Sequence, residues 1–222
     1  MALSAKGAVA SLLLILGLIA TPNGMKATSF SFSGGFSQDD NVQLYLFGVS
    51  APSTVMLQTW SFGGGTDAAG QKIAAGGFAT ALSLYSASGA EALVGYTTSW
   101  SCPPANVDAA SVLGCGDAAL NESLGAGYYV LAVTEYYNLP NGLTLSAGFS
   151  EAGQGNFTGP NLCGATGGFF DADCDQRRGN FEVDIVGANS ASAVPEPATF
   201  WMAGFALLGV ALLVKEMKCH TR

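Results

Sequence analysis

The stretch VQLYLFGV at residues 42–49 decides the fold class of this 222-residue chain. Val42, Leu44 and Leu46 share one face of an extended strand, and the residues between them share the other. Seven further segments behave similarly, being rich in aromatic and β-branched residues and separated by glycine-rich breaks: 28–34, 53–60, 78–86, 92–98, 127–137, 143–149 and 180–186. No segment of this middle region sustains a helical period. The sequence therefore predicts an all-β fold, an antiparallel β-sandwich with jelly-roll-like strand order.

The connections between these segments differ in length. LPNG at 139–142 predicts a hairpin, because Asn and Gly tolerate positive φ. Two irregular stretches, 99–124 and 150–179, are much longer, and loops of such length are uncommon unless they are functional or disordered. Residues 188–194, ANSASAV, are small and polar, and we expect a linker there. The predicted sandwich domain therefore covers residues 28–187.

The N-terminus has the pattern of a secretory signal peptide. Lys6 precedes the apolar run VASLLLILGLIA at 9–20, which leads into a polar stretch containing glycine and proline. The run is too short to span a bilayer comfortably as a mature helix. We place the cleavage site after Ala27, so that residues 1–27 are removed on export.

The exported region is strongly acidic. Between residues 28 and 194, Lys72, Arg177 and Arg178 stand against fourteen Asp and Glu residues, a net charge of −11. Such a surface repels the phosphates of nucleic acids, so no nucleic acid is expected as a partner.

The exported region also holds four cysteines, Cys102, Cys115, Cys163 and Cys174. An exported chain meets an oxidising compartment, where neighbouring cysteines pair. Among the three possible connectivities we expect the local one, Cys102–Cys115 and Cys163–Cys174, which closes two short loops. Zinc binding is the competing interpretation, but neither spacing is the close pair typical of zinc ligands, and no histidine is near.

A second apolar run lies near the C-terminus. Residues 198–214 carry no charge, and as a helix they extend roughly 25 Å, a little under the roughly 30 Å hydrocarbon core of a bilayer. Lys215, Lys218 and Arg222 follow, and the positive-inside preference keeps them in the cytoplasm. This arrangement predicts a transmembrane helix over 198–214 with the sandwich domain on the outer side of the inner membrane.

Pro195-Glu196-Pro197 stands directly before this run and is held extended by its two prolines, in a form that a processing enzyme can grip. With Val194, the apolar helix and the basic cluster, residues 195–222 resemble the PEP-CTERM sorting signal of exported proteins of Gram-negative bacteria. The resemblance implies recognition by an exosortase, an integral-membrane cysteine protease that removes the tail. It also implies residence at the cell surface or in an extracellular polysaccharide matrix or biofilm. The alternative is an ordinary single-pass membrane anchor.

The exported domain offers few groups for catalysis. The one histidine of the chain, His220, lies in the tail, which excludes Ser-His-Asp and Cys-His catalysis in the domain. Glycoside hydrolysis needs only two carboxylates, and the candidates are Asp39, Asp40, Glu122 and Glu135. Their spacing does not show that any pair faces a cleft, so we expect no enzyme.

Four segments of the domain carry a second resemblance: FSFSGGFSQDDNVQLYLF (30–47), APSTVMLQTWSFGGGTDAAGQKIAAGGF (51–78), LSLYSASG (82–89) and RRGNFEVDI (177–185). They resemble a group of PEP-CTERM ectodomains related to bacterial pre-peptidase C-terminal β-sandwiches. The resemblance implies a jelly-roll-like accessory domain without catalytic residues.

Two candidate binding sites remain. Asp171, Asp173 and Asp175 have the alternate-carboxylate spacing of calcium loops, although the glycine and distal glutamate of an EF-hand are missing; a solvated loop is the alternative, and no other cofactor is expected. Trp100, beside Cys102 in a loop, is the candidate for stacking on a sugar. We therefore expect a non-catalytic matrix protein. The alternatives are a carbohydrate-binding module and, less favoured, an acid-pair glycoside hydrolase.

Overall fold

The computed structural model describes residues 28–98 and 116–195. The predicted signal peptide, Trp100, Cys102, Cys115 and the tail from Glu196 onwards, which includes Pro197 and the predicted helix 198–214, lie outside these residues. Among the residues that the structure describes, no helix has the length and hydropathy needed to cross a membrane.

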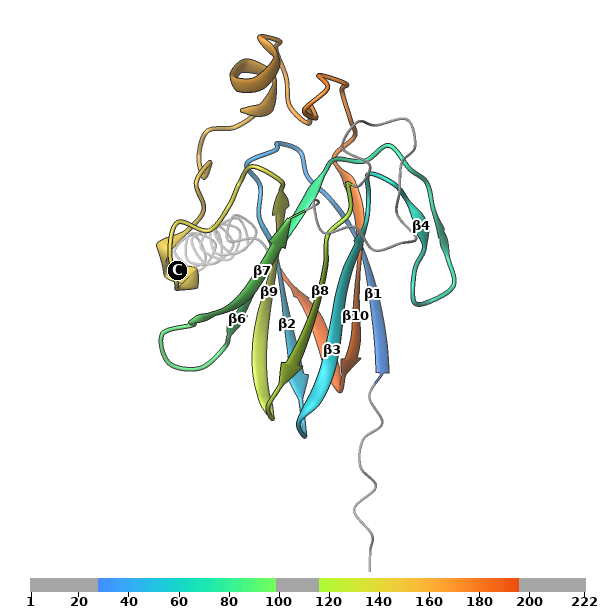
Figure 1. The fold of residues 1–222 in the computed structure, drawn as a ribbon, viewed down its shortest axis with the longest axis vertical. Helices are drawn as coiled ribbons and strands as arrows, with labels where there is room; N and C mark the ends of the chain where they lie inside the picture. Colours follow the sequence, from blue (N-terminus) through green and yellow to red (C-terminus); the bar gives the residue numbers. More distant parts are fainter. Residues whose placement is uncertain (1–27, 99–115, 196–222) are drawn as a thin grey trace, which may run out of the picture.

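Four antiparallel strand pairs are nested one inside another along the chain. The innermost pair joins β6 (Thr80–Ser86) to β7 (Leu93–Thr98), and the next joins β3 (Ser53–Trp60) to β8 (Ala119–Leu124). Outside these, β2 (Gln43–Val49) pairs with β9 (Gly127–Glu135), and β1 (Thr28–Gly35) pairs with β10 (Asn180–Ala188). The chain is thus one long hairpin of four strand pairs (Figure 1).

Two further pairings roll this hairpin into a sandwich. β10 pairs with β3 and β9 pairs with β6, which gives sheets with the orders β1-β10-β3-β8 and β11-β2-β9-β6-β7. If β4, β5 and β11 are left out and the eight strands of the nested pairs are renumbered 1 to 8 along the chain, the sheet orders are 1-8-3-6 and 2-7-4-5. This is the arrangement produced by wrapping a hairpin of four strand pairs into two sheets. The predicted antiparallel β-sandwich with jelly-roll-like order is confirmed.

The core lies between the two sheets and follows from strand alternation. On β2, Tyr45, Phe47 and Val49 face inward, and on β10 the inward residues are Phe181, Val183 and Ile185. Aromatic rings fill the end of this core near Phe78, whose ring centre lies 5.3–5.9 Å from those of its three aromatic neighbours, Phe36, Phe169 and Phe181.

A second apolar cluster covers the outer face of the five-stranded sheet. Leu44 and Tyr85 point outward there and pack with Leu145 and Phe149. Residues 143–149, predicted as a strand, instead contain a 3₁₀ helix at Leu145–Ala147. A single β-bridge lies on each side of this helix, Ala92 with Thr144 and Pro140 with Phe149. That prediction is wrong because Leu145 and Phe149 cover the outer face of the sheet and do not extend it.

Two other expectations are corrected. The irregular stretch predicted over 99–124 ends in a regular strand, β8, which pairs with β3 along its whole length. The linker predicted over 188–194 contains β11 (Ser190–Val194), which pairs antiparallel with β2. The sandwich domain therefore continues to Val194 and does not end at residue 187.

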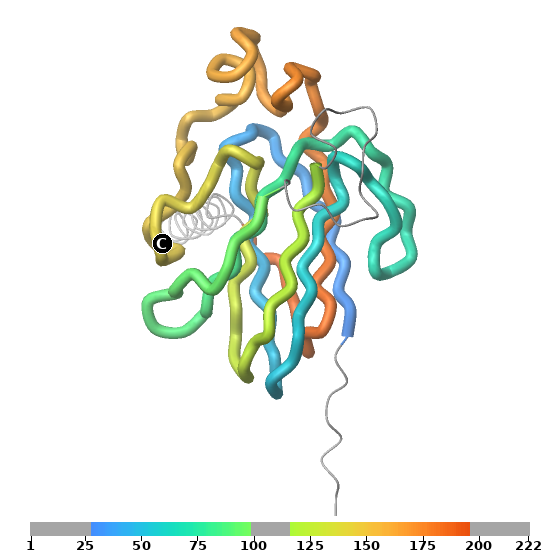
Figure 2. Tube along the Cα trace, in the orientation of Figure 1, coloured from blue at the N-terminus to red at the C-terminus, as the bar shows by residue number. Residues whose placement is uncertain are grey.

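The two ends of the sandwich differ. Short turns join the strands at one end: residues 50–52, 87–92 and 125–126 and the single residue Asn189. The other end holds the long connections 36–42, 61–79 and 136–179, the last of which Figure 2 shows as the yellow-to-orange tube rising above the sheets. Because β11 runs antiparallel to β2, it ends at the second end, beside the long connections.

Candidate functional site

The C-terminal strand leads directly into the predicted sorting motif. β11 pairs with β2 from Ser190, opposite Gly48, to Val194, opposite Leu44. The side-chain Nε2 of Gln43 donates hydrogen bonds of 2.9 Å to the backbone carbonyls of both Leu44 and Val194. Pro195 follows at once and has no N–H to continue the pairing. The last residue of the domain and the first residue of the Pro-Glu-Pro triplet are therefore neighbours in the chain.

A sharp change of direction delivers β11 to its place. β10 belongs to one sheet and β11 to the other, with only Asn189 between them. Gly187 permits the change, because its φ is +98° and a Cβ there would lie 2.5 Å from the carbonyl oxygen of Thr54. The side chain of Asn189 then accepts a 2.7 Å hydrogen bond from the backbone N–H of Ser50.

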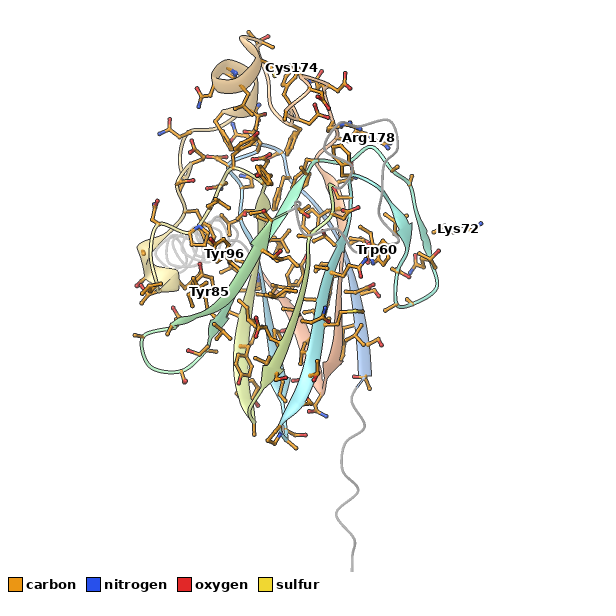
Figure 3. The ribbon with its side chains drawn as sticks, in the orientation of Figure 1. Trp60, Lys72, Tyr85, Tyr96, Cys174 and Arg178 are labelled. Atoms are coloured by element: carbon orange, nitrogen blue, oxygen red, sulfur yellow. A yellow bond between two sulfur atoms is a disulfide. The ribbon has the colours of Figure 1, made fainter. Side chains whose placement is uncertain are left out.

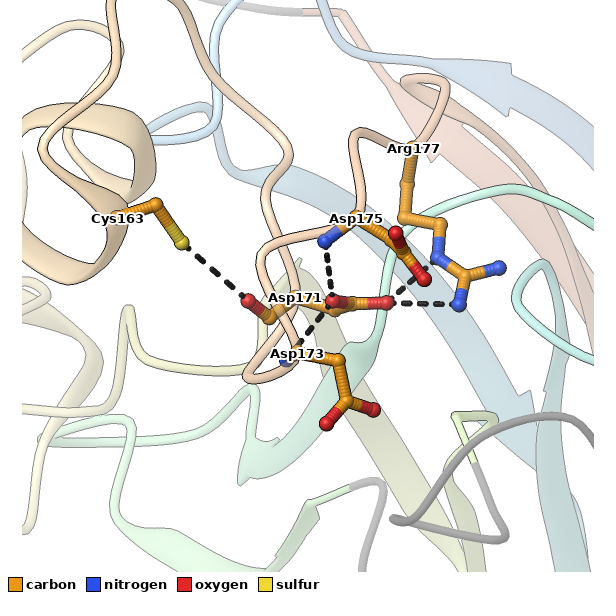
Figure 4. A network of polar contacts seen from close by, with 5 residues as sticks. All are labelled: Cys163, Asp171, Asp173, Asp175 and Arg177. Atoms are coloured by element: carbon orange, nitrogen blue, oxygen red, sulfur yellow. Dashed lines mark hydrogen bonds and ion pairs between the residues drawn. The ribbon is translucent and has the colours of Figure 1, made fainter.

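The long connection 136–179 is fixed by a disulfide and a buried carboxylate. Cys163 and Cys174 are bonded, which confirms this predicted pair. Asp171 Oδ1 accepts hydrogen bonds from the backbone N–H groups of Asp173 and Asp175, and its Oδ2 accepts two from Arg177, each of 2.7 Å (Figure 4). The Asp171 carboxylate is therefore occupied by four donors.

The same network places the three aspartates that were considered for calcium. The alternate spacing of Asp171, Asp173 and Asp175 builds a turn around one carboxylate, while the side chains of the other two residues stay at the exposed surface. Figure 4 shows the carboxylate of Asp173 pointing away from that of Asp171. In residues 28–98 and 116–195, no three Asp, Glu, Cys or His side chains are grouped so that they could hold a metal ion.

Asp39 and Asp40, two of the four carboxylates considered for catalysis, hold a loop in place. Asp39 is fully buried and accepts hydrogen bonds from the backbone N–H groups of Phe157, Thr158 and Phe169, and from the Thr158 hydroxyl. The neighbouring Asp40 accepts two more through Oδ2, from the backbone of Gly153 and Gly155. The pair pins the long connection 136–179 to the end of the sandwich.

The two glutamates lie elsewhere. Glu135 is buried at the end of β9 and accepts a 2.7 Å hydrogen bond from the N–H of Tyr137. Burial raises the pKa of its carboxyl well above the usual range, and the nearby negative charges of Asp39 and Glu151 act in the same direction. Glu122 lies on β8 beside Gly95 of β7. Thus the structure brings Asp39 near Glu135 in the interior and does not place the four carboxylates around one opening.

A buried carboxylate that sequence reasoning missed joins the middle strands. Asp117 accepts hydrogen bonds from three consecutive backbone N–H groups, those of residues 61–63, at 2.5–3.2 Å. Burial nevertheless raises its pKa to about 7, against the lowering effect of these hydrogen bonds. No sequence motif marks Asp117. Its role as an acceptor for the backbone of residues 61–63 follows only from its position in the structure, just before β8.

A cleft of about 280 Å³ opens on the outer face of the four-stranded sheet, under the hairpin of β4 (Gly65–Thr66) and β5 (Lys72–Ile73). Figure 3 shows Trp60 between hairpin and sheet and Lys72 extending outward. Trp60 Nε1 donates a 2.7 Å hydrogen bond to Asp184, which also accepts one from Ser31. The cleft is lined by aromatic, aliphatic and polar groups, among them Trp60, Ile73, Arg178, Asn180, Phe181 and Glu182.

The floor of this cleft contains a carboxyl group with a raised pKa. Glu182 is buried, and desolvation raises its pKa, as do the negative charges of Asp67 and Asp184; a hydrogen bond from Ser33 lowers it. Arg178 lies at the rim, where its guanidinium donates to the backbone carbonyls of residues 75 and 76. The cleft therefore presents a carboxyl and a guanidinium group beside an indole ring.

Comparison with known proteins assigns the C-terminal segment. Residues 193–215 match the model of the PEP-CTERM protein-sorting motif. The chain is thus an exported protein that is sorted at the membrane by an exosortase. Among solved structures, the pre-peptidase C-terminal domain of a collagenase from Bacillus anthracis is similar, with 12% identity over 74% of this chain and 90% of that domain and a TM-score of 0.33. No curated protein matches.

Proposed function

We propose that this PEP-CTERM protein is a non-catalytic structural component of an extracellular polysaccharide or biofilm matrix. In this proposal a signal peptide exports it across the inner membrane of a Gram-negative cell, and the C-terminal helix holds it there until the exosortase removes the tail. The observation that carries the proposal is the direct attachment of the sorting motif to β11, the final strand of a closed sandwich.

The hydrogen bonds that the domain's carboxylates accept from the backbone support a structural role. Asp39, Asp40, Asp117 and Asp171 each accept at least two backbone N–H groups, so they hold loops in place. The disulfide Cys163–Cys174 adds a covalent restraint suited to life outside the cell.

Mass spectrometry of the protein recovered from cells and from the surrounding matrix tests the sorting steps. The expected mature protein begins near Thr28 and ends near Pro195. Deleting Pro195-Glu196-Pro197 is expected to leave the tail attached and the protein in the membrane fraction. An intact Arg222 on matrix protein, or unchanged processing after the deletion, would overturn the proposal.

A carbohydrate-binding role is the second candidate, and the cleft beside Trp60 favours it. Its volume of about 280 Å³ lies just below the range of ligand pockets, roughly 300–1,000 Å³. Asn180 and Glu182 can exchange hydrogen bonds with hydroxyl groups, while the indole offers an apolar wall. A single sugar ring is the ligand class that combines these two kinds of surface.

Titration of the purified domain with matrix polysaccharide separates the two candidates. Saturable binding that Asn180→Ala weakens at least fivefold supports the carbohydrate-binding role. Lys72→Ala is the control, because Lys72 belongs to the β4–β5 hairpin that covers the cleft but its side chain points away from the cleft. Absence of binding at millimolar sugar supports the structural role alone.

A further inference from the structure

The sorting motif and the folded domain share residues. The match to the motif begins at residue 193, and β11 ends at Val194. Ala193 and Val194 are therefore part of both, and they lie opposite Tyr45 and Leu44 in the sheet. The matched segment therefore starts inside the hydrogen-bonded sandwich.

The distance available to the enzyme is short. If the membrane helix begins at residue 198, only residues 195–197 separate it from β11, and they span at most about 11 Å when fully extended. A protease must enclose the residues before and after the bond that it cleaves. The space along one edge of β11 is already filled by β2, at the strand spacing of about 4.8 Å.

β11 is attached to the sandwich mainly through its backbone. Its residues are only Ser, Ala and Val, and Ala191 is the one that packs against the core. The neighbouring β2, by contrast, buries Tyr45, Phe47 and Val49. Removing β11 from the edge therefore costs its hydrogen bonds but exposes little apolar surface, and the eight strands of the nested pairs stay in place.

We propose that β11 separates from β2 when the exosortase takes up its substrate, and that residues 190–194 enter the enzyme together with the Pro-Glu-Pro triplet. This inference rests on the sorting function described above. Gln43 then sets how readily the strand leaves, because its side chain holds the carbonyl of Val194. The partner surface is thus the strand itself, presented extended to the membrane protease.

A reversible staple tests this step in cells that contain the exosortase. Leu46 and Ser192 are directly opposite and both are exposed on the outer face of the sheet, so Leu46→Cys with Ser192→Cys places two thiols at cross-strand distance. With the staple closed, we expect removal of the tail from the full-length protein to slow at least tenfold. A reductant should restore it, and the single variants L46C and S192C should be processed normally with and without reductant.

A second variant covers the case in which the staple disturbs folding. Gln43→Ala removes the hydrogen bond to Val194 and should speed processing at least twofold, whereas Gln58→Ala, on the other sheet, should not. Normal processing of the closed staple, shown closed by thiol labelling, would overturn the inference. If deletion of the Pro-Glu-Pro triplet still blocks processing in that experiment, the sorting function stands and only the separation of β11 is refuted.

Discussion

The guanidinium carbon of Arg177 lies 4.0 Å from the ring centre of Phe62, while the same side chain is bonded to Asp171. Arg177 therefore joins the long connection 136–179 to the start of the β4–β5 hairpin segment. The two segments are far apart in the sequence, and both lie at the same end of the sandwich. A single cation thus fastens two long connections to each other.

Replacing this cation should weaken the whole domain. Arg177→Met leaves the carboxylate of Asp171 buried without its partner, and we expect a loss of about 3 kcal/mol in the free energy of unfolding. Arg178→Met is the control, since Arg178 is exposed and donates only to backbone carbonyls, and it should cost about 1 kcal/mol or less. Urea denaturation of both variants measures the difference, and equal losses would contradict this role of Arg177.

Breaking the disulfide should act on the same end of the domain. The bond Cys163–Cys174 joins residues 11 apart, and closing a loop of this size stabilises a protein by about 2–3 kcal/mol in the chain-entropy treatment. We expect Cys163→Ser with Cys174→Ser to lower stability by that amount. Hydrogen exchange should show the loss of protection concentrated in residues 150–179, with β2 and β9 unchanged. Uniform loss across the sheets would show that the bond supports the sandwich itself.

Acid should stabilise the domain. The pKa of Asp117 is raised from 3.8 to about 7, and those of Glu135 and Glu182 are also raised. In the range between the unfolded and folded pKa values, the folded state binds protons that the unfolded chain releases, so stability is lost as pH rises. We expect the denaturation midpoint to decrease as the pH rises from about 4 to about 7, and Asp117→Asn to flatten this slope. A midpoint that rises over that range would contradict these shifts.

The turn of the chain from β10 to β11 should depend on a glycine. Gly187→Ala forces a Cβ against the carbonyl oxygen of Thr54 at a φ of +98°, and we expect a loss of about 2–3 kcal/mol. Gly125→Ala, where a Cβ would meet nothing within 4 Å, should change stability by about 0.5 kcal/mol or less. Thermal unfolding of the two variants compares the positions, and a neutral G187A would show that β11 can join the sheet by another path.

Local pattern predicted the strands that supply the core, and long-range pairing determined the rest. β3 has the bounds predicted from STVMLQTW, because its residues are of the kinds that favour strands. β8, with Asn121 and Glu122, and β11, with only Ser, Ala and Val, have weak strand propensity of their own. They become strands because β3 and β2 offer them an edge, which no local window of sequence reveals.

The candidate sites divide in the same way. Pro195 and the motif around it were found from the sequence because a sorting signal is a local pattern that an enzyme reads locally. Cys163–Cys174 was predictable because both partners lie in one short segment. The roles of Asp39 and Asp117 were not, since their hydrogen-bond donors come from residues more than 50 positions away. Side-chain type alone does not distinguish a catalytic acid from one that holds a loop.

β11 ends at the same end of the sandwich as the long connections, and this position has a consequence for maturation. Under the proposed function, an anchor starting a few residues beyond Val194 would turn the end with the long connections towards the lipid and the end with the short turns towards the outside. Removal of that anchor would free the long connections to face outward. On this proposal, any partner of the long connections would be met only after maturation.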